Sequence, residues 1–442
     1  MFNSIRILRQ CSYRLMLCLL VAQVNASDGP GEQVTGTPND HTPGVDVKQI
    51  DTAWQQFIDS LVNSGKLVRD QPFSNTVVNR FEGYRAALAI TSVGYANLMF
   101  PNADSPEYIP DFGPLVNYCA PSPDYKYGIF HLNPEATYRV RGFRGDAEFI
   151  DLQQQAGWYG HTSDKKQVKT LVNITFAEID SGLDKNGNYD FVLSTERPKN
   201  YAGPWWKLEE GANALFIREF YIDYNTKPRA ATFHIDRIDQ TANASSTIKE
   251  ADEAVFRLAS MARMHDYLNL CLRMGSAFPK SDNEFREERY DEGAGQINQR
   301  YFQARYNIEP DEALVIEWTV PNQCMFWSFS LYNDYWQVLN YGNRQTHLNS
   351  SMVNIGDDGV ATMIVSHRDP GVNNWIDVDG HNTGILLGRA KICGKASVPR
   401  LEVLSFDQLQ KAVLPGMKAV STKMRKAQLS ERREHYLHRY SR

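Results

Sequence analysis

Two regions of this chain consist of short runs of β-forming residues, and the pattern of one region is repeated in the other. In the first, DKNGNYDFVLSTERPKN leads into PWWKLEEGANALFIREF, and in the second, GDDGVATMIVSHRDPGVNNW leads into IDVDGHNTGILLGRAKI. Gly187 to Ser194 spans seven residues, as does Gly359 to Ser366. Each copy continues with a Pro loop, a Trp and a strand-like run that ends in Arg: Trp206 and Arg218, then Trp375 and Arg389. This order predicts two related sheet modules, and convergent hairpin chemistry is the alternative.

The β-type runs determine the expected fold class. Turn residues separate them at short intervals, which is typical of antiparallel sandwiches. The 8 Trp, 22 Tyr and 21 Phe are usual in β-rich cores, and they also suit stacking on sugars or flat ligands. We expect a mainly β protein with α-helical embellishments, built as two β-sandwich or jelly-roll-like domains in tandem. The runs lie at 137–143, 169–179, 189–195, 213–223, 229–238, 313–320, 325–333, 335–342, 361–366 and 384–392.

Helical patterns lie before, between and after the β regions. Apolar residues from Val47 to Leu61 follow helical spacing, residues 247–274 form a long amphipathic pattern, and Ser405 with Gln408 begins a C-terminal helix. The run ERREHYLHR near the end predicts a solvated charged helix. The expected organisation is a signal peptide (1–26), a flexible leader (27–45), helices with the first sandwich (46–245), a helical linker (246–300), the second sandwich (301–404) and a C-terminal helix or tail (405–442).

The first residues predict export. MFNSIRILRQCSYR is basic, LMLCLLVAQV is a short apolar run, and VNA ends in small residues before Ser27. This is the pattern of a secretory signal peptide cleaved after Ala26, so we expect a secreted or periplasmic protein. A short membrane anchor or a misjudged start site is the alternative. The later sequence contains no run apolar enough to cross a membrane.

Four cysteines follow the expected cleavage site: Cys119, Cys271, Cys324 and Cys393. In an oxidising compartment they can form disulfides, and four cysteines allow three pairings between which the sequence does not choose. Four buried free thiols are the alternative. The absence of a C-x-x-C pair or a Cys/His cluster gives no support to a zinc site, and we expect neither a metal nor a cofactor.

Charge and missing motifs exclude several functional classes. The net charge of −5 argues against a nucleic-acid partner, which selects for a basic face. The chain has no G-x-S-x-G elbow, no P-loop, no G-x-G-x-x-G and no H-E-x-x-H. These absences remove the commonest hydrolase, kinase, dinucleotide and zinc-protease readings. A glycosidase or lyase is not removed, because its acid/base residues can come from scattered strands.

The second β region carries a resemblance to a known family. YFQARYNIEPDEALVIEWTVPNQCMFWSFSLYNDYW, followed by DDGVATMIVSHRDPGVNNWIDVDGHNTGILLGRAKI, resembles the DUF1214 domain over roughly residues 300–395. The P-x-x-x-x-W-S-x-x-L-Y-N pattern, the DG hairpin and the N-W … G-H … G … R run carry it. The earlier β region resembles the partner domain DUF1254 more loosely. The resemblance implies two β-sandwich or jelly-roll-like domains, and it implies no reaction.

The segment NNWIDVDGHNTG holds the first set of candidate site residues. If Asp377 and His381 face one cavity, the carboxylate orients the imidazole for proton transfer. Trp375 could stack on a ring, Arg389 could hold a carboxylate or sulfate, and His367 could join from the preceding strand. In the alternative reading the segment is a turn, Trp375 plugs the sandwich end, and Arg389 pairs with a nearby acid.

A second set lies in FWSFSLYNDYWQVLNYGNRQTHLN, where aromatic and polar residues alternate. Trp336, Tyr341 and Arg344 could line a shallow aromatic groove for glycans. The alternative is a pair of strand faces, one packed inward and one in water.

These observations favour an exported protein that binds a carbohydrate or another polar, ring-bearing small molecule in an aromatic cleft. The first alternative is a hydrolase or lyase acting on such a ligand, with His381 as acid/base. The second is a structural or interaction protein without a small-molecule site. The sequence leaves the oligomeric state open.

Overall fold

The computed structural model describes residues 46–161, 168–239, 251–276, 281–288 and 299–440. These residues belong to one compact unit, Gly44–Arg442. The expected signal peptide and flexible leader lie outside the described residues, as does part of the expected linker.

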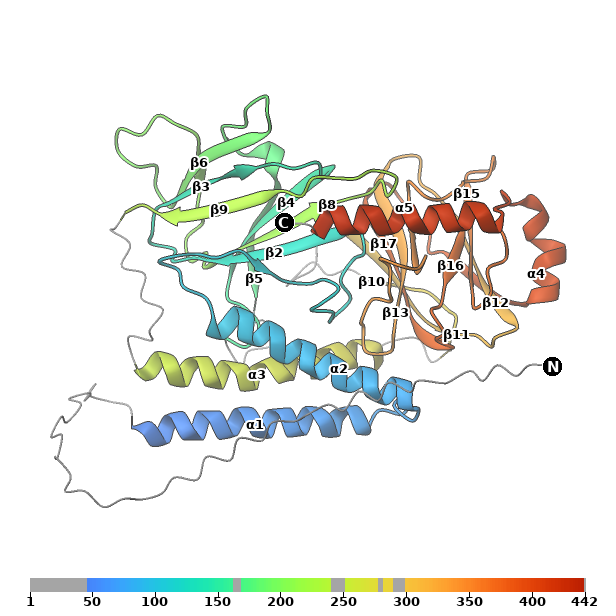
Figure 1. The fold of residues 1–442 in the computed structure, drawn as a ribbon, viewed down its shortest axis with the longest axis horizontal. Coiled ribbons are helices and arrows are strands. Elements are labelled where there is room, and N and C mark those ends of the chain that lie inside the picture. The colour runs from blue at the N-terminus through green and yellow to red at the C-terminus, as the bar shows by residue number, and fades with distance from the viewer. Residues whose placement is uncertain (1–45, 162–167, 240–250, 277–280, 289–298, 441–442) are drawn as a thin grey trace, which may run out of the picture. The chain divides into compact units, whose positions relative to one another are not determined.

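Three long helices, two near the N-terminus and one between the two β regions, pack together and form the helical layer. α1 (Val47–Arg69) lies beside α3 (Ala251–Ser276), and α2 (Val77–Gly94) contacts both (Figure 1). α1 begins at a capping box in which Asp46 and Gln49 satisfy each other's backbone N–H groups. Short turns and two later helices complete the helical elements: the π-helical turn Tyr95–Met99, the 3-10 turns Phe176–Glu178 and Leu414–Gly416, α4 (Phe406–Ala412) and α5 (Thr422–Tyr440).

The strands fall into two modules of two sheets each. The first module pairs the sheet β1-β2-β8-β4-β5 with the sheet β7-β6-β3-β9. Its strands are β1 (Ile109–Pro110), β2 (Tyr125–His131), β3 (Tyr138–Phe143), β4 (Phe149–Ala156), β5 (Lys169–Thr175), β6 (Asn188–Ser194), β7 (Trp205–Lys207), β8 (Ala214–Phe220) and β9 (Thr232–Arg237).

The second module pairs the sheet β10-β11-β17-β13-β14 with the sheet β16-β15-β12-β18. Its strands are β10 (Arg286–Glu288), β11 (Gln299–Asn307), β12 (Glu312–Thr319), β13 (Cys324–Tyr332), β14 (His347–Asn349), β15 (Val360–Ser366), β16 (Trp375–Asp377), β17 (Thr383–Cys393) and β18 (Arg400–Ser405). The predicted fold class is confirmed: the protein is mainly β, with helices added to two sandwich-like sheet pairs.

Within the described residues, each strand of the first module has its equivalent nine strands later. The sheet orders correspond position by position, and the pairings keep the same direction. Both modules even contain the same parallel pair, β6 with β7 and β15 with β16, in otherwise antiparallel sheets. The repeat seen in the sequence therefore extends to whole modules.

Each module has its own apolar core between its two sheets. The first core includes Val140, Leu193 and Ile217, and the second includes Ile316 and Leu386, all fully buried. Burying one such side chain contributes about 1.5–3 kcal/mol. β3 shows the alternation expected of a strand with one wet face, whereas β8 is buried along its whole length. Full burial of β8 means that the second face of its sheet is covered as well.

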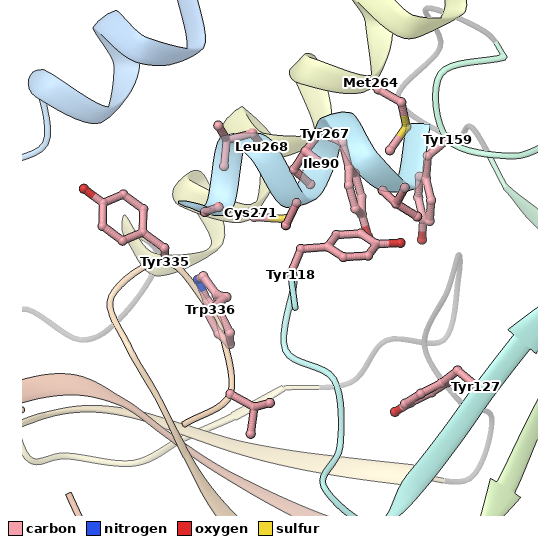
Figure 2. Close-up of a cluster of buried hydrophobic side chains, with 14 of the residues drawn as sticks. Ile90, Tyr118, Tyr127, Tyr159, Met264, Tyr267, Leu268, Cys271, Tyr335 and Trp336 are labelled. Carbon is pink, nitrogen blue, oxygen red and sulfur yellow. The ribbon is translucent and has the colours of Figure 1, made fainter. Parts of the chain in front are cut away.

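The helical layer shares a third core with both modules. Ile90 of α2 and Leu268 of α3 face Tyr118, which precedes β2, and Trp336, which follows β13 (Figure 2). The disulfide between Cys119 and Cys271 joins the same regions covalently.

The second disulfide joins Cys324 and Cys393 at the paired ends of β13 and β17. Of the three pairings that four cysteines allow, the structure thus has Cys119–Cys271 with Cys324–Cys393. Among the described residues no helix is long and apolar enough to cross a membrane.

The predicted strand 335–342 is wrong. The segment is irregular, because the side-chain oxygen of Asn333 accepts the backbone N–H groups of Tyr335 and Gln337, both at 3.0 Å, and folds the chain into a turn. Trp336 in that turn has a φ of 61°. The alternation of polar and aromatic residues there reflects turn chemistry and core packing.

Candidate ligand-binding site

Trp375 is a packed indole that closes the end of its sheet. It is 6% exposed, and its Nε1 donates to Ser366 Oγ at 3.0 Å. In the first module the indole of Trp205 donates to Ser194 Oγ, also at 3.0 Å. The equivalent of Trp375 is therefore Trp205, and the sequence alignment on Trp206 is wrong by one residue. In both modules this indole–serine hydrogen bond fastens the Trp that follows the Pro loop to the strand that precedes the loop.

His381 lies in the turn before β17 and faces helix α2. Its Nε2 is 3.1 Å from Oε1 of Glu82, and its Nδ1 is 3.2 Å from the carbonyl oxygen of Val378. Burial lowers the pKa of His381, but the hydrogen bond and charge of Glu82, with smaller contributions from the Val378 carbonyl and Asp379, together raise it above the ordinary value. The contact ties the turn to α2, 299 residues away in the sequence.

Asp377 pairs with Arg344 and not with His381 among the described residues. The Arg344 guanidinium lies 2.6 Å from Oδ2 of Asp377 and 2.9 Å from Oδ1 of Asp379. Arg344 is about half exposed, whereas Asp377 is buried. The structure thus brings Arg344 and Asp377 together in one ion-pair cluster and gives His381 a different carboxylate.

Arg389 lies deep between the modules and pairs with no acid among the described residues. It donates to the Tyr332 hydroxyl at 2.7 Å and to the Ala120 carbonyl at 2.6 Å. Arg389 stands opposite Tyr301 on β11, as Arg218 stands opposite Tyr127 on β2. The two arginines are thus equivalent positions of the repeat.

The charges of both arginines act on the buried side chain of Tyr127. Burial raises the pKa of Tyr127, and the charges of Arg389 and Arg218 both oppose that rise. Lys391, two residues after Arg389, reaches across to the first module and lies 2.6 Å from Oδ2 of Asp151. The facing surfaces of the two modules therefore form a polar, tyrosine-rich contact.

The other three predicted ligand-binding residues are also buried or partly buried. Trp336 is 1% exposed and belongs to the core under the helical layer. Tyr341 bonds the hydroxyl of Tyr440 at 3.0 Å. His367 follows β15, and its Nε2 has no hydrogen-bond partner among the described residues. The predicted residues do not form one cleft, because they are spread over the helical-layer core, the module contact and the underside of α5.

The C-terminal helix α5 corrects the prediction of a solvated helix. Arg425, Arg432, His435 and Arg439 are buried on its inner face. Arg425 lies 2.9 Å from Asp369 and donates to the carbonyl of Val372, and Arg439 packs on tyrosine rings. The inner face of α5 is therefore held by charged side chains. The three arginines recur every seven residues, which is the one sequence signal of this face.

A chain of buried polar groups runs inward from Arg432. Its Nη1 lies 3.0 Å from Nδ1 of His347, and Nε2 of His347 lies 3.3 Å from Oδ1 of Asp124. Burial lowers the pKa of His347 to about 4, so the ring is neutral at pH 7. Nδ1 then accepts from Arg432, and Nε2–H donates to Asp124. His347 lies in the aromatic and polar run for which a pocket was predicted, whereas no local pattern in the sequence predicts a site role for Arg432 or Asp124.

A cavity of about 230 Å³ opens beside Arg432, between α5, the segment after β14 and the segment after β8. It adjoins the predicted segment, since Asn373 lines it and Gln345 bonds the backbone carbonyl of Trp375 at 2.5 Å. Amide, hydroxyl and charged groups predominate in its wall. The lining residues are Tyr224, Asn225, Gln345, Leu348, Ser351, Met352, Asn354, Asn373, Lys418, Gln428, Glu431 and Arg432.

Comparison with known proteins agrees with the sequence resemblance in the second module. Residues 304–390 match the family model described as protein of unknown function (DUF1214). No curated protein matches the chain. A solved structure of an uncharacterized protein from Burkholderia cenocepacia is 24% identical, with a TM-score of 0.73 over 82% of this chain and 100% of that chain. A second, from Vibrio parahaemolyticus, is 11% identical, with a TM-score of 0.41 over 81% and 100% of the two chains. The Burkholderia protein shares the fold of this chain.

Proposed function

We propose that this protein binds a small, hydroxylated ligand such as a carbohydrate in the cavity under α5. The observation that carries the proposal is the cavity itself, about 230 Å³ in volume, with its predominantly polar wall. Small-molecule sites are concave and use a few placed polar groups to fix the orientation of the ligand.

The wall offers a hydroxylated ring both donors and acceptors. Five side-chain amides line it, those of Asn225, Gln345, Asn354, Asn373 and Gln428. An amide has an acceptor oxygen and two N–H donors, which matches the donor and acceptor character of a sugar hydroxyl. Asn225, Gln345, Asn373 and Gln428 already use part of these groups for bonds inside the protein, so Asn354 is the amide most open to a ligand. Tyr224 also lines the cavity, although its ring is buried and stacks on His435. The ligand expected from the sequence is kept, and its site moves from Trp375 to the neighbouring cavity.

Export is part of the proposal. Two disulfides, Cys119–Cys271 and Cys324–Cys393, suit an oxidising compartment outside the cytoplasm. The basic and apolar N-terminal residues support cleavage after Ala26. We also retain as a proposal that the first module is of the DUF1254 type.

A ligand screen with two matched variants tests the proposal. Neutral sugars, uronic and sulfated sugars, sterols and aromatic acids are compared by thermal shift, since a ligand at about 100 times its Kd stabilises the native state by roughly 2.7 kcal/mol. Asn354→Ala removes an exposed amide from the cavity wall, and Asn322→Ala removes an exposed amide outside it. We expect the first variant to weaken binding about fivefold, from one lost hydrogen bond, and the second to leave it unchanged.

Two results would contradict the proposal. One is a panel without any stabilising ligand, which would favour the structural or interaction role. The other is a ligand whose affinity is equal in both variants. The catalytic assignment of His381 and Asp377 stays a prediction: loss of turnover in His381→Ala, with ligand affinity intact, would establish it.

A further inference from the structure

On the basis of the proposed function, we propose that the ligand carries a carboxylate, as a sugar acid does, and that Arg432 and Lys418 recognise it. The charge of the cavity wall is a property separate from the wall's capacity to bind hydroxyl groups. It therefore selects one class among the ligands that the cavity could hold.

Arg432 is a buried cation at the cavity wall. It is 4% exposed, and no carboxylate lies within ion-pair distance of it among the described residues. Its Nη1 donates to the carbonyl oxygen of Tyr341 at 3.3 Å and lies 3.0 Å from Nδ1 of His347. Its Nη2 donates to the carbonyl oxygen of His347 at 3.2 Å and to Sδ of Met352 at 3.5 Å, so Arg432 acts on a ligand chiefly through its charge. All these acceptors are neutral. Arg432 is therefore a buried cation without a direct ion pair among the described residues, which is an energetically costly arrangement.

The nearest carboxylate on the inner side does not neutralise Arg432 directly. Asp124 is separated from it by the neutral ring of His347, to which both are bonded. Burial lowers the pKa of Arg432 to about 10, Tyr224 and the charge of Asp124 oppose that lowering, and the neighbouring cations on the helix, Arg425 and Arg439, add to it. Arg425 is itself paired with Asp369, so Arg432 and Lys418 are the cations of the described wall that an anion in the cavity would meet.

The exposed part of the wall carries one charge of each sign. Lys418 and Glu431 both line the cavity and are both exposed to solvent. With Arg432 the described lining holds two cations and one anion, a net charge of +1. A ligand carboxylate would approach Lys418 and Arg432, whereas Glu431 would repel it. Arg and Lys form charge-assisted hydrogen bonds with carboxylates that are about twice as strong as neutral ones.

Isothermal titration calorimetry with matched sugars tests the inference. Glucose is compared with glucuronate, and galactose with galacturonate, at low ionic strength. A charge-assisted hydrogen bond contributes about 1.5–3 kcal/mol, so each uronate should bind about tenfold or more tightly than its neutral parent. High salt should reduce that preference, because it screens the exposed part of the site.

Exposed variants locate the effect without disturbing the buried network. Lys418→Gln should weaken uronate binding several-fold and leave the binding of the neutral parent unchanged. Glu431→Gln should strengthen uronate binding. Lys423→Gln, an exposed lysine on α5 that does not line the cavity, is the control and should behave as the wild type.

The outcomes separate the two proposals. Equal affinity for a uronate and its neutral parent overturns the carboxylate inference and leaves the proposed function intact. Equal effects of Lys418→Gln and Lys423→Gln also overturn it. Absence of binding for all four sugars, together with a negative wider screen, overturns the proposed function and the inference with it.

Discussion

Replacing His381 by Gln tests the contact that joins the turn before β17 to helix α2. Nε2 of His381 lies 3.1 Å from Glu82 Oε1, and the two side chains are 14% and 8% exposed. A hydrogen bond to a charged group contributes about 1.5–3 kcal/mol to stability. After the substitution Glu82 retains Arg85 at 3.4 Å, which partly compensates its charge. We therefore expect the free energy of unfolding to fall by about 2 kcal/mol below neutral pH.

The expected loss depends on pH in one direction. Folding raises the pKa of His381 above 6.5, because Glu82, helped by the Val378 carbonyl and Asp379, outweighs the lowering by burial. A group with a raised folded-state pKa takes up a proton on folding, so its contribution is fully present below about pH 6.5 and is lost as the pH rises through the folded-state pKa. The difference between wild type and His381→Gln should accordingly be largest near pH 6 and shrink towards pH 9.

Urea unfolding at pH 6, 7.5 and 9, followed by tryptophan fluorescence, measures this difference. His234→Gln is the matched control, since His234 is exposed on β9. A stability loss in His381→Gln that is constant across the three pH values would refute the ion-pair reasoning. A loss no larger than that of the control would refute the contact itself.

Three further substitutions test other contacts. Cys271→Ser opens the disulfide with Cys119, which spans 152 residues. In the chain-entropy estimate the free energy of unfolding falls by about 5 kcal/mol. A urea titration without reductant measures this loss, and a loss under about 1 kcal/mol would contradict the estimate. Trp375→Phe removes a buried indole donor and should cost about 1–3 kcal/mol, more than Trp205→Phe at the less buried equivalent; equal costs would contradict the argument. Gly384→Ala places a Cβ 2.4 Å from a backbone oxygen, so the melting temperature should fall, and an unchanged value would show that β17 can shift freely.

Much of the fold could be predicted from the sequence, because β periodicity and turn residues are local signals. The strands around Ser194 and Ser366, and the cap at Ser405, follow from patterns of a few residues. The prediction of a strand at 335–342 was wrong because it, too, relied on a local signal. Its aromatic alternation imitates a strand, and the side chain of Asn333 overrides that pattern by bonding the backbone.

The candidate site was less predictable, because its contacts join distant positions and use residues that are usually exposed. Glu82 contacts His381 although 299 residues separate them, and no local spacing in the sequence predicts that pair. Arginine is usually exposed, so the charged run that contains Arg432 predicted a solvated helix. The tertiary structure instead buries both Arg432 and Arg439. Asn373 was within the segment that the sequence singled out, but its role in a cavity wall depends on α5.

The equivalence of Arg218 and Arg389 has a consequence for how the chain could have arisen. Two copies that meet through the same face place like residues near like residues, as in a twofold homodimer. In an ancestral pair of separate subunits the two arginines would have occupied symmetry-related positions. Lys391 departs from that symmetry, since its counterpart two residues after Arg218 is Phe220, and it reaches Asp151 of the other half. Fusion into one polypeptide permits such a one-sided ion pair, which a symmetric dimer could form only twice or not at all.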